Sequence, residues 1–230
     1  MQHAVLSYLA KTGFGGVFKG GTCLQKAFSL PRYSEDIDFT LNDATFVLPD
    51  FDALSAFLSS YGFGQTKVKK ASDFRFLSAK LRVQGPLYNG KELSEATVIL
   101  EFSLREKTIF PPVAKTITPP YPDFLAYALP VMDEKEIACE KIRAILTRYS
   151  ARDLFDLYFL LRQESISVEK NWVDEKLKYY DKKFGFEEFA ERVGKVKKIW
   201  VKEISSLTPN PVDYETAAGL VLEKTKQWLG

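Results

Sequence analysis

Two aspartates separated by one apolar residue, Asp36 and Asp38, follow a Lys-Gly-Gly-Thr turn at residues 19–22. The interval between the two motifs fits one short helix and a loop. In a β-strand alternate side chains point to the same face, so the two carboxylates would lie about 6.5–7 Å apart along one edge. Carboxylate oxygens suit Mg²⁺, which completes its shell with water and substrate phosphates. The spacing therefore predicts a phosphate-handling site with two Mg²⁺ ions, for which Mn²⁺ is a substitute.

The turn before the aspartates supplies the second half of the pattern. A buried strand is predicted over 15–19, and Gly20 and Gly21 let the backbone bend sharply and approach a ligand without a Cβ in the way. Thr22 opens a helix predicted over 22–28, whose first N–H groups and positive dipole end favour an anion. Each motif alone is most often an ordinary turn or an exposed strand end, but the pair indicates a triphosphate site. The residues assigned to that site are Lys19, Gly20, Gly21 and Thr22.

The composition permits this interpretation and excludes several others. With 230 residues, 46% of them hydrophobic, the chain can bury a core as one large domain or as two lobes. The formal net charge of +2 leaves any nucleic-acid binding to a local patch. His3 is the only histidine, which excludes a multi-histidine metal site, and the two cysteines do not make a disulfide framework.

The sequence also predicts where the protein resides. No stretch approaches the roughly 18 apolar residues of a membrane span, and the N-terminus lacks the order of a signal peptide. The small number of cysteines fits a reducing compartment. We therefore expect a soluble, cytoplasmic protein with no membrane partner.

Hydrophobic periodicity makes the first half of the chain a mixture of helices and strands. Two strands near its end alternate in polarity and are separated by a Gly-Pro loop, as in a hairpin. The expected elements are helices over 2–11 and 51–61, a strand over 36–41, and the hairpin strands 74–83 and 97–104 around the loop 85–90.

Glu101 lies in a run of residues, 98–102, that is otherwise apolar and therefore expected to be buried. Glutamate is rarely buried unless it is paired or bound to a cation. If its strand lies beside the strand of Asp36 and Asp38, three carboxylates converge. The alternative is an exposed glutamate on an edge strand.

A proline-rich connection over 108–130, with a short strand at 124–131, leads into a second half that is almost wholly helical. A continuous helical pattern begins at Asp133, a suitable N-cap. The predicted fold is α+β: a mixed sheet flanked by helices, followed by a mainly helical C-terminal lobe. The predicted domains are 1–131 and 132–230, and the remaining helices are expected over 168–180, 184–207 and 213–229.

Lys141, Arg148 and Arg152 recur at spacings of seven and four, so they share related faces if the helix continues past Tyr149 and Ser150. Basic residues facing a carboxylate-metal site can bind nucleotide phosphates or an RNA backbone. The alternative is a solvated helix face. Arg32 and Ser34, next to the aspartate pair, either touch phosphate or only fix their loop.

The motifs resemble those of the DNA polymerase β-like nucleotidyltransferase superfamily, in which a Gly-Gly or Gly-Ser turn, a helix and Asp-x-Asp follow one another. Within it, the chain is similar to the AbiEii/AbiGii toxin family of type IV toxin-antitoxin systems. The segments that carry the similarity are 20–28, 32–39, 140–148 and 151–157.

The resemblance implies a nucleotidyltransferase catalytic domain, completed at its cleft by the helical lobe. It implies that Asp36, Asp38 and Glu101 are the catalytic metal ligands. It also implies that Lys141 contacts the triphosphate and that Asp153 or Asp156 orients that lysine. The substrate would be a nucleoside triphosphate (NTP), whose nucleotide is transferred to an acceptor hydroxyl.

Some related toxins extend the 3′ end of tRNA, so a tRNA or another RNA is the first choice of acceptor. The family's antitoxins usually include a winged-helix repressor, which implies a cognate antitoxin of that type. One alternative is transfer to a small molecule or to a protein hydroxyl. Another is a catalytically silent module that only binds nucleotide or RNA, against which the intact set of three carboxylates argues.

Overall fold

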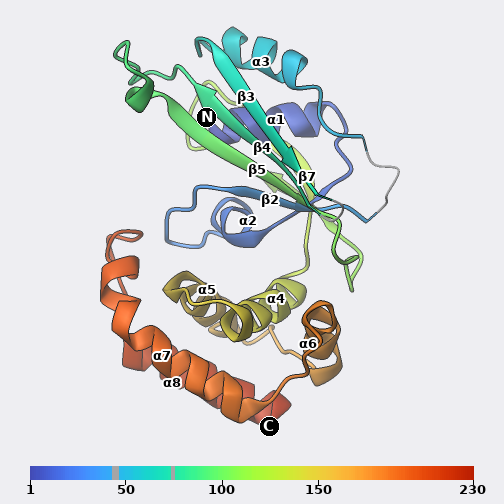
Figure 1. Cartoon of the computed structure of the whole chain (residues 1–230), viewed down its shortest axis with the longest axis vertical. Helices are drawn as coiled ribbons and strands as arrows, with labels where there is room; N and C mark the ends of the chain where they lie inside the picture. Colours follow the sequence, from blue (N-terminus) through green and yellow to red (C-terminus); the bar gives the residue numbers. More distant parts are fainter. Residues whose placement is uncertain (43–46, 74–75) are drawn as a thin grey trace. The chain divides into compact units, whose positions relative to one another are not determined.

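The computed structural model describes residues 1–42, 47–73 and 76–230 (Figure 1). Contacts between residues divide the chain into two units. The first comprises Met1–Ala27, Glu35–Lys107 and Pro112–Val131, and the second comprises Phe28–Ser34, Thr108–Pro111 and Met132–Gly230. Two short segments from the first half of the chain thus belong to the unit formed by its second half. The division into functional domains at residue 131 stays a prediction.

The described part of unit 1 forms a seven-stranded mixed sheet with the strand order β3-β4-β5-β2-β1-β7-β6 (Figure 1). The strands that carry the two acidic motifs, β2 and β5, are direct neighbours and run parallel. The strand bounds are Val17–Lys19 (β1), Ile37–Thr40 (β2), Thr66–Ser72 (β3), Phe76–Val83 (β4), Ala96–Ser103 (β5), Val113–Ile117 (β6) and Tyr127–Val131 (β7).

One face of this sheet is the core of unit 1. Phe39 and Phe102 are fully buried there, and their stacked rings lie 5.8 Å apart. Phe14, just after α1 (Gln2–Lys11), packs its ring 4.9 Å from that of Phe39. Because strand side chains alternate, the residues between the buried ones project from the opposite face. The other helices of unit 1 are α2 (Gly20–Ala27), α3 (Phe51–Ser60) and the short η1 (Glu92–Ser94).

Two strands were not predicted. β3 places lysines at alternate positions, so its sequence resembles a polar loop rather than a half-buried strand. β6 lies in the proline-rich connection, where an edge strand is compatible with flanking prolines. The predicted strand 74–83 is observed from Phe76, since 74–75 lie outside the described residues.

Unit 2 is built mainly from helices. α5 (Ala151–Leu161) packs against α4 (Glu134–Thr147), α7 (Phe186–Ile204) and α8 (Tyr214–Leu229), which makes it the central helix of this unit. The predicted N-cap is confirmed, because the Asp133 carboxylate accepts a hydrogen bond from the Lys135 N–H at 2.8 Å. The unit also contains α6 (Lys170–Leu177) and the short η2 (Lys178–Tyr180).

The condition for a shared face of Lys141, Arg148 and Arg152 is not met, because α4 ends at Thr147 and does not continue past Tyr149 and Ser150. The backbone becomes extended at Arg148, with φ −141° and ψ 171°, and a new helix begins at Ala151. The Ala151 N–H donates to Glu203 Oε2 at 2.9 Å, which satisfies one of the first N–H groups of α5. The basic residues on either side of this break therefore do not share a helix face.

The α+β fold, with a mixed sheet and a helical C-terminal part, is confirmed. Across residues 1–42, 47–73 and 76–230, no helix combines the length and apolar character that a membrane span needs. The cytoplasmic location stays a prediction.

Candidate active site

A lysine and two carboxylates stand side by side on three adjacent strands of unit 1. Lys19 on β1 is the register partner of Asp38 on β2, and Asp38 is in turn the register partner of Glu101 on β5. Residues directly opposite each other share a face, with Cβ atoms about 4.5–5.5 Å apart. The lysine is buried, and both carboxylates are half-buried. The structure therefore places Glu101 beside Asp38, as the sequence pattern anticipated, on a central strand rather than an edge.

Gly20 lies directly against the Asp38 carboxylate. Its φ is +76°, a conformation that side chains rarely adopt, and a Cβ at this position would come within 2.4 Å of Asp38 Oδ2. The turn thus requires glycine at this position for its backbone conformation and for the space that Asp38 occupies.

Thr22 holds the backbone at the first aspartate. The side chain is fully buried, and its hydroxyl donates a hydrogen bond to the Asp36 carbonyl oxygen. α2 begins at Gly20 rather than at Thr22, so Thr22 lies in the first turn of the helix. The Thr22 side chain therefore fixes the approach to β2, while Asp36 and Asp38 both stay half-buried.

The donor set of this row fits a divalent cation. Carboxylate oxygens on neighbouring strands are ligands that Mg²⁺ accepts, and Mg²⁺ usually binds through one or two carboxylates plus phosphates. Within the described ranges, no group of three or more His, Cys, Asp or Glu side chains is arranged to hold a metal ion. The carboxylates of Asp38 and Glu101 fit a metal held jointly with a substrate, and the metal-ligand roles stay predictions.

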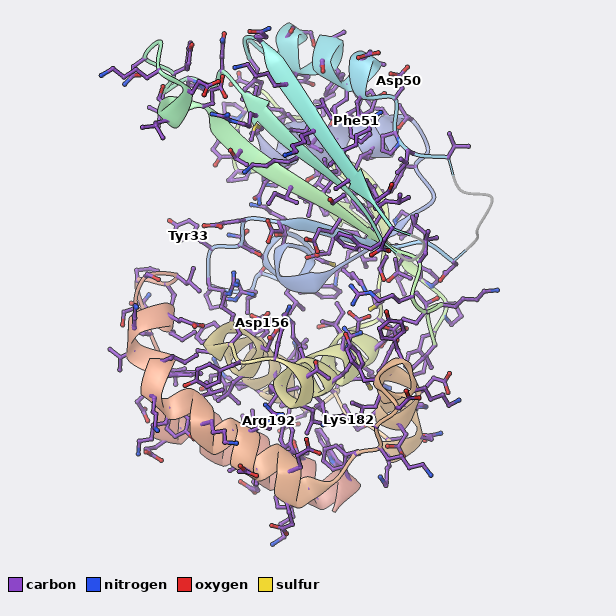
Figure 2. The ribbon with its side chains drawn as sticks, in the orientation of Figure 1. Tyr33, Asp50, Phe51, Asp156, Lys182 and Arg192 are labelled. Atoms are coloured by element: carbon purple, nitrogen blue, oxygen red, sulfur yellow. The ribbon has the colours of Figure 1, made fainter. Side chains whose placement is uncertain are left out.

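Unit 2 contains a largely buried cluster of alternating charges around Asp156, which Figure 2 labels. Asp156, on the central helix α5, accepts from Arg32 Nε at 2.5 Å and from Arg32 Nη2 at 2.7 Å, which is a two-pronged ion pair. The Lys141 ammonium lies 2.7 Å from Asp156 Oδ2 and 3.0 Å from Asp153 Oδ1. Arg148 closes the cluster, with its Nε 2.6 Å from Asp153 Oδ2.

Asp153 and Lys141 favour each other's charged form. Burial alone would raise the pKa of the Asp153 carboxyl, but the attraction of Lys141 and its hydrogen bonds with Arg148 hold that pKa well below its usual range. Burial alone would lower the pKa of Lys141, but Asp156 and Asp153 raise it above its ordinary value. The ion pair of Asp153 with Lys141 therefore offsets the cost of burying both groups.

The sequence pointed to the contact of Lys141 with Asp153 and Asp156, but not to the ion pair of Arg32 with Asp156. Arg32 and Asp156 are 124 positions apart, and no local pattern connects them. Arg152 is exposed on α5 outside the cluster, and Ser34 is half-buried in the Phe28–Ser34 segment. The phosphate-binding roles of these residues stay predictions.

A cavity of about 450 Å³ in unit 1 is separate from this chemistry. It is lined by the end of α1, by residues 12–15 and by residues 47–50. None of the predicted site residues borders it.

Solved structures of nucleotidyltransferases share this fold. The nucleotidyltransferase toxin MenT4 from Mycobacterium tuberculosis H37Rv aligns with a TM-score of 0.60 and 21% identity, over 97% of this chain and 80% of its own. A crystal structure described as a nucleotidyltransferase from H. pylori gives a TM-score of 0.62 and 21% identity, over 98% and 90%. JHP933 from Helicobacter pylori gives 0.56 and 21%, over 98% and 88%.

The family model for the AbiEii nucleotidyl transferase toxin of type IV toxin-antitoxin (TA) systems matches residues 10–228. The chain therefore belongs to the AbiEii toxin family, and the resemblance found in the sequence is confirmed. A search of curated proteins finds no match for the chain. Membership makes the protein a nucleotidyltransferase toxin of a type IV system, with an NTP as substrate and an antitoxin as partner.

Proposed function

We propose that this protein is a Mg²⁺-dependent nucleotidyltransferase that moves the nucleotide of an NTP onto the 3′ end of tRNA. The observation that carries the proposal is the register of Asp38 with Glu101, directly beside Gly20. This arrangement aligns two carboxylates from parallel strands on one sheet face, next to a helix N-terminus that suits an anion.

The reaction is an in-line displacement at the α-phosphorus of the NTP. The acceptor hydroxyl oxygen forms the new P–O bond, the bond to the β-phosphate oxygen breaks, and pyrophosphate leaves. The hydroxyl proton passes to a carboxylate of the row, for which Glu101 is the proposed acceptor. When bound, Mg²⁺ neutralises phosphate charge and lowers the pKa of the attacking hydroxyl. Asp36 and Asp38 are the residues that would hold that ion beside the phosphates.

Phosphate binding is assigned to the residues around the glycine turn. Lys19, in register with Asp38, supplies positive charge, and the first N–H groups of α2 would supply donors for an anion. In unit 2, the Lys141 ammonium has three N–H donors, and Asp153 and Asp156 accept from it. We assign its third donor to a phosphate oxygen.

The test is a transfer assay with each labelled NTP, Mg²⁺ and either total tRNA or a protein lysate. Label in the tRNA band supports the proposal. Label in protein would identify a protein hydroxyl as the acceptor, and label in neither would favour a small molecule or a silent binding module. Omitting Mg²⁺ with a chelator, then restoring it or adding Mn²⁺, tests the metal requirement.

The antitoxin is proposed to be a winged-helix repressor, and the site of action is proposed to be the cytoplasm. The antitoxin type follows from the family resemblance, and the location follows from the few cysteines and the lack of a long apolar run in the sequence. Co-expression with such a repressor, with growth as the readout, tests whether it neutralises the protein.

A further inference from the structure

The sheet face that carries Asp38 and Glu101 continues outward across β5, β4 and β3. On the outer strands this face is exposed, whereas the alternate residues of β4 and β5 are buried against the core. Three rows of register partners cross it, namely Glu101-Ser78-Ala71, Ile99-Lys80-Lys69 and Thr97-Arg82-Lys67. The second and third rows are basic.

Lys69 and Lys80 lie directly opposite each other on β3 and β4, and both are exposed. Like charges at directly opposed positions destabilise a sheet. Among the residues that the structure describes, no carboxylate pairs with either lysine. Repulsion between the two ammonium groups therefore destabilises the sheet in the isolated protein. A bound anion would remove this repulsion.

The next row differs, because its charges are balanced. Lys67 Nζ lies 3.0 Å from Glu95 Oε1, and Arg82 Nε lies 2.9 Å from Glu95 Oε2. Glu92 adds a second carboxylate 3.3 Å from Lys67 Nζ. The uncompensated positive charge on this face is thus concentrated at Lys69 and Lys80, in the row next to Glu101.

Protection of a sheet edge does not explain both lysines. Lysine on an edge strand prevents pairing with another chain, and β3 is an edge strand. Edge protection explains the lysine at position 69 but not the one at position 80, because β4 lies between β3 and β5 and is not an edge strand. Lys70, the neighbour on β3, points to the other face, where its ammonium lies 4.8 Å from the centre of the Phe51 ring.

We propose that Lys69 and Lys80 bind the phosphate backbone of the acceptor nucleic acid and guide its 3′ end to Asp38 and Glu101. The inference rests on the proposed transfer to RNA. Diagonal neighbours on adjacent strands are about 7–8 Å apart, so Lys80 lies one such step from Glu101. A polyanion lying along this row would bring its end to the carboxylates.

The test compares the double variant Lys69→Gln/Lys80→Gln with the control Lys70→Gln, which changes the same residue type on the opposite face of the same strand. Binding of labelled bulk tRNA is measured by fluorescence anisotropy between about 50 mM and about 200 mM salt. Loss of two phosphate contacts should weaken binding by about tenfold at low salt and reduce the slope of log K against log salt by about 1.4. The control should match the natural protein.

A charge-conserving variant, Lys69→Arg/Lys80→Arg, should restore both affinity and slope. Unchanged tRNA binding and slope in the Gln double variant would overturn the inference. A raised KM for the NTP in the Gln double variant, with unchanged tRNA binding, would also overturn the inference, because it would assign the two lysines to nucleotide binding. If the natural protein transfers no label to tRNA but the slope still falls in the variant, the proposed acceptor fails while the binding surface stands.

Discussion

The Asp38 carboxylate occupies the space that any side chain at Gly20 would need, with Oδ2 2.4 Å from the position of a Cβ. Gly20 is thus a structural requirement of the carboxylate row. Gly20 has two reasons to be glycine, its positive φ and the lack of space for a Cβ. Gly62 has only the first, because its φ is +81° but nothing lies within 4 Å of its Cβ position.

Gly20→Ala should therefore abolish nucleotide transfer, because the new methyl group displaces the Asp38 carboxylate. Gly62→Ala is the matched control: it should cost about 1–3 kcal/mol of stability from backbone strain alone and keep the specific activity. Thermal unfolding and labelled-nucleotide incorporation, measured on both variants, check this. Equal activities of the two variants would show that Asp38 tolerates displacement.

Asp38→Asn and Glu101→Gln keep the shape of the row but remove charge. We expect each to lower the transfer rate by about 10³-fold with little change in the unfolding temperature. Glu92→Gln, an exposed carboxylate at the outer end of the hairpin, serves as the control and should retain full activity. A fully active Asp38→Asn protein would contradict the ligand assignment.

Thr22→Val replaces a buried hydroxyl with a methyl group and leaves the Asp36 carbonyl oxygen without that hydrogen bond. The expected cost is about 1–3 kcal/mol in the free energy of unfolding, measured in urea, together with a lower transfer rate. Thr22→Ser retains the hydroxyl and should recover much of the rate. If Thr22→Val lowered the free energy of unfolding but not the transfer rate, the hydroxyl would contribute to folding and not to catalysis.

Asp153 makes the stability of unit 2 sensitive to acid. Its folded pKa lies below the ordinary value of 3.8, so its contribution is present above about pH 4 and is lost as the pH falls through the folded pKa. Asp153→Asn should destabilise the protein by about 3–5 kcal/mol at neutral pH, because Lys141 and Arg148 lose a buried partner. The variant should also lose less stability than the natural protein on acidification.

Urea unfolding at a series of pH values checks both effects. Glu191→Gln, which breaks only the exposed pair with Lys195, is the control and should leave the unfolding curves nearly unchanged. A parallel acid response of Asp153→Asn and the natural protein would mean that Asp153 is not the group that titrates.

The sequence was most informative where local pattern and tertiary structure agree. Asp38 and Glu101 each interrupt a buried alternating run, so their shared sheet face could be anticipated. Strand β3 could not be, because its lysines give it the polarity of a loop and only its pairing with β4 identifies it. For the same reason the basic rows on its exposed face were missed.

The charge cluster of unit 2 could be predicted only in part from the sequence. The break after α4 falls at Tyr149 and Ser150, where the sequence left continuation of the helix open, and it changes which residues meet. The pairing of Arg32 with Asp156 depends on how distant segments fold together, which residue spacing does not encode.

The Phe28–Ser34 segment precedes Asp36 by only a few residues, yet its partners are made late in translation. Arg32 pairs with Asp156, and the Tyr33 N–H donates to the Leu207 carbonyl oxygen at 2.8 Å. During synthesis, the contact of Arg32 can form only after α5 has been made, and that of Tyr33 only after α7 has been made. The backbone that leads into the aspartate motif therefore reaches these contacts only long after it has itself been synthesised.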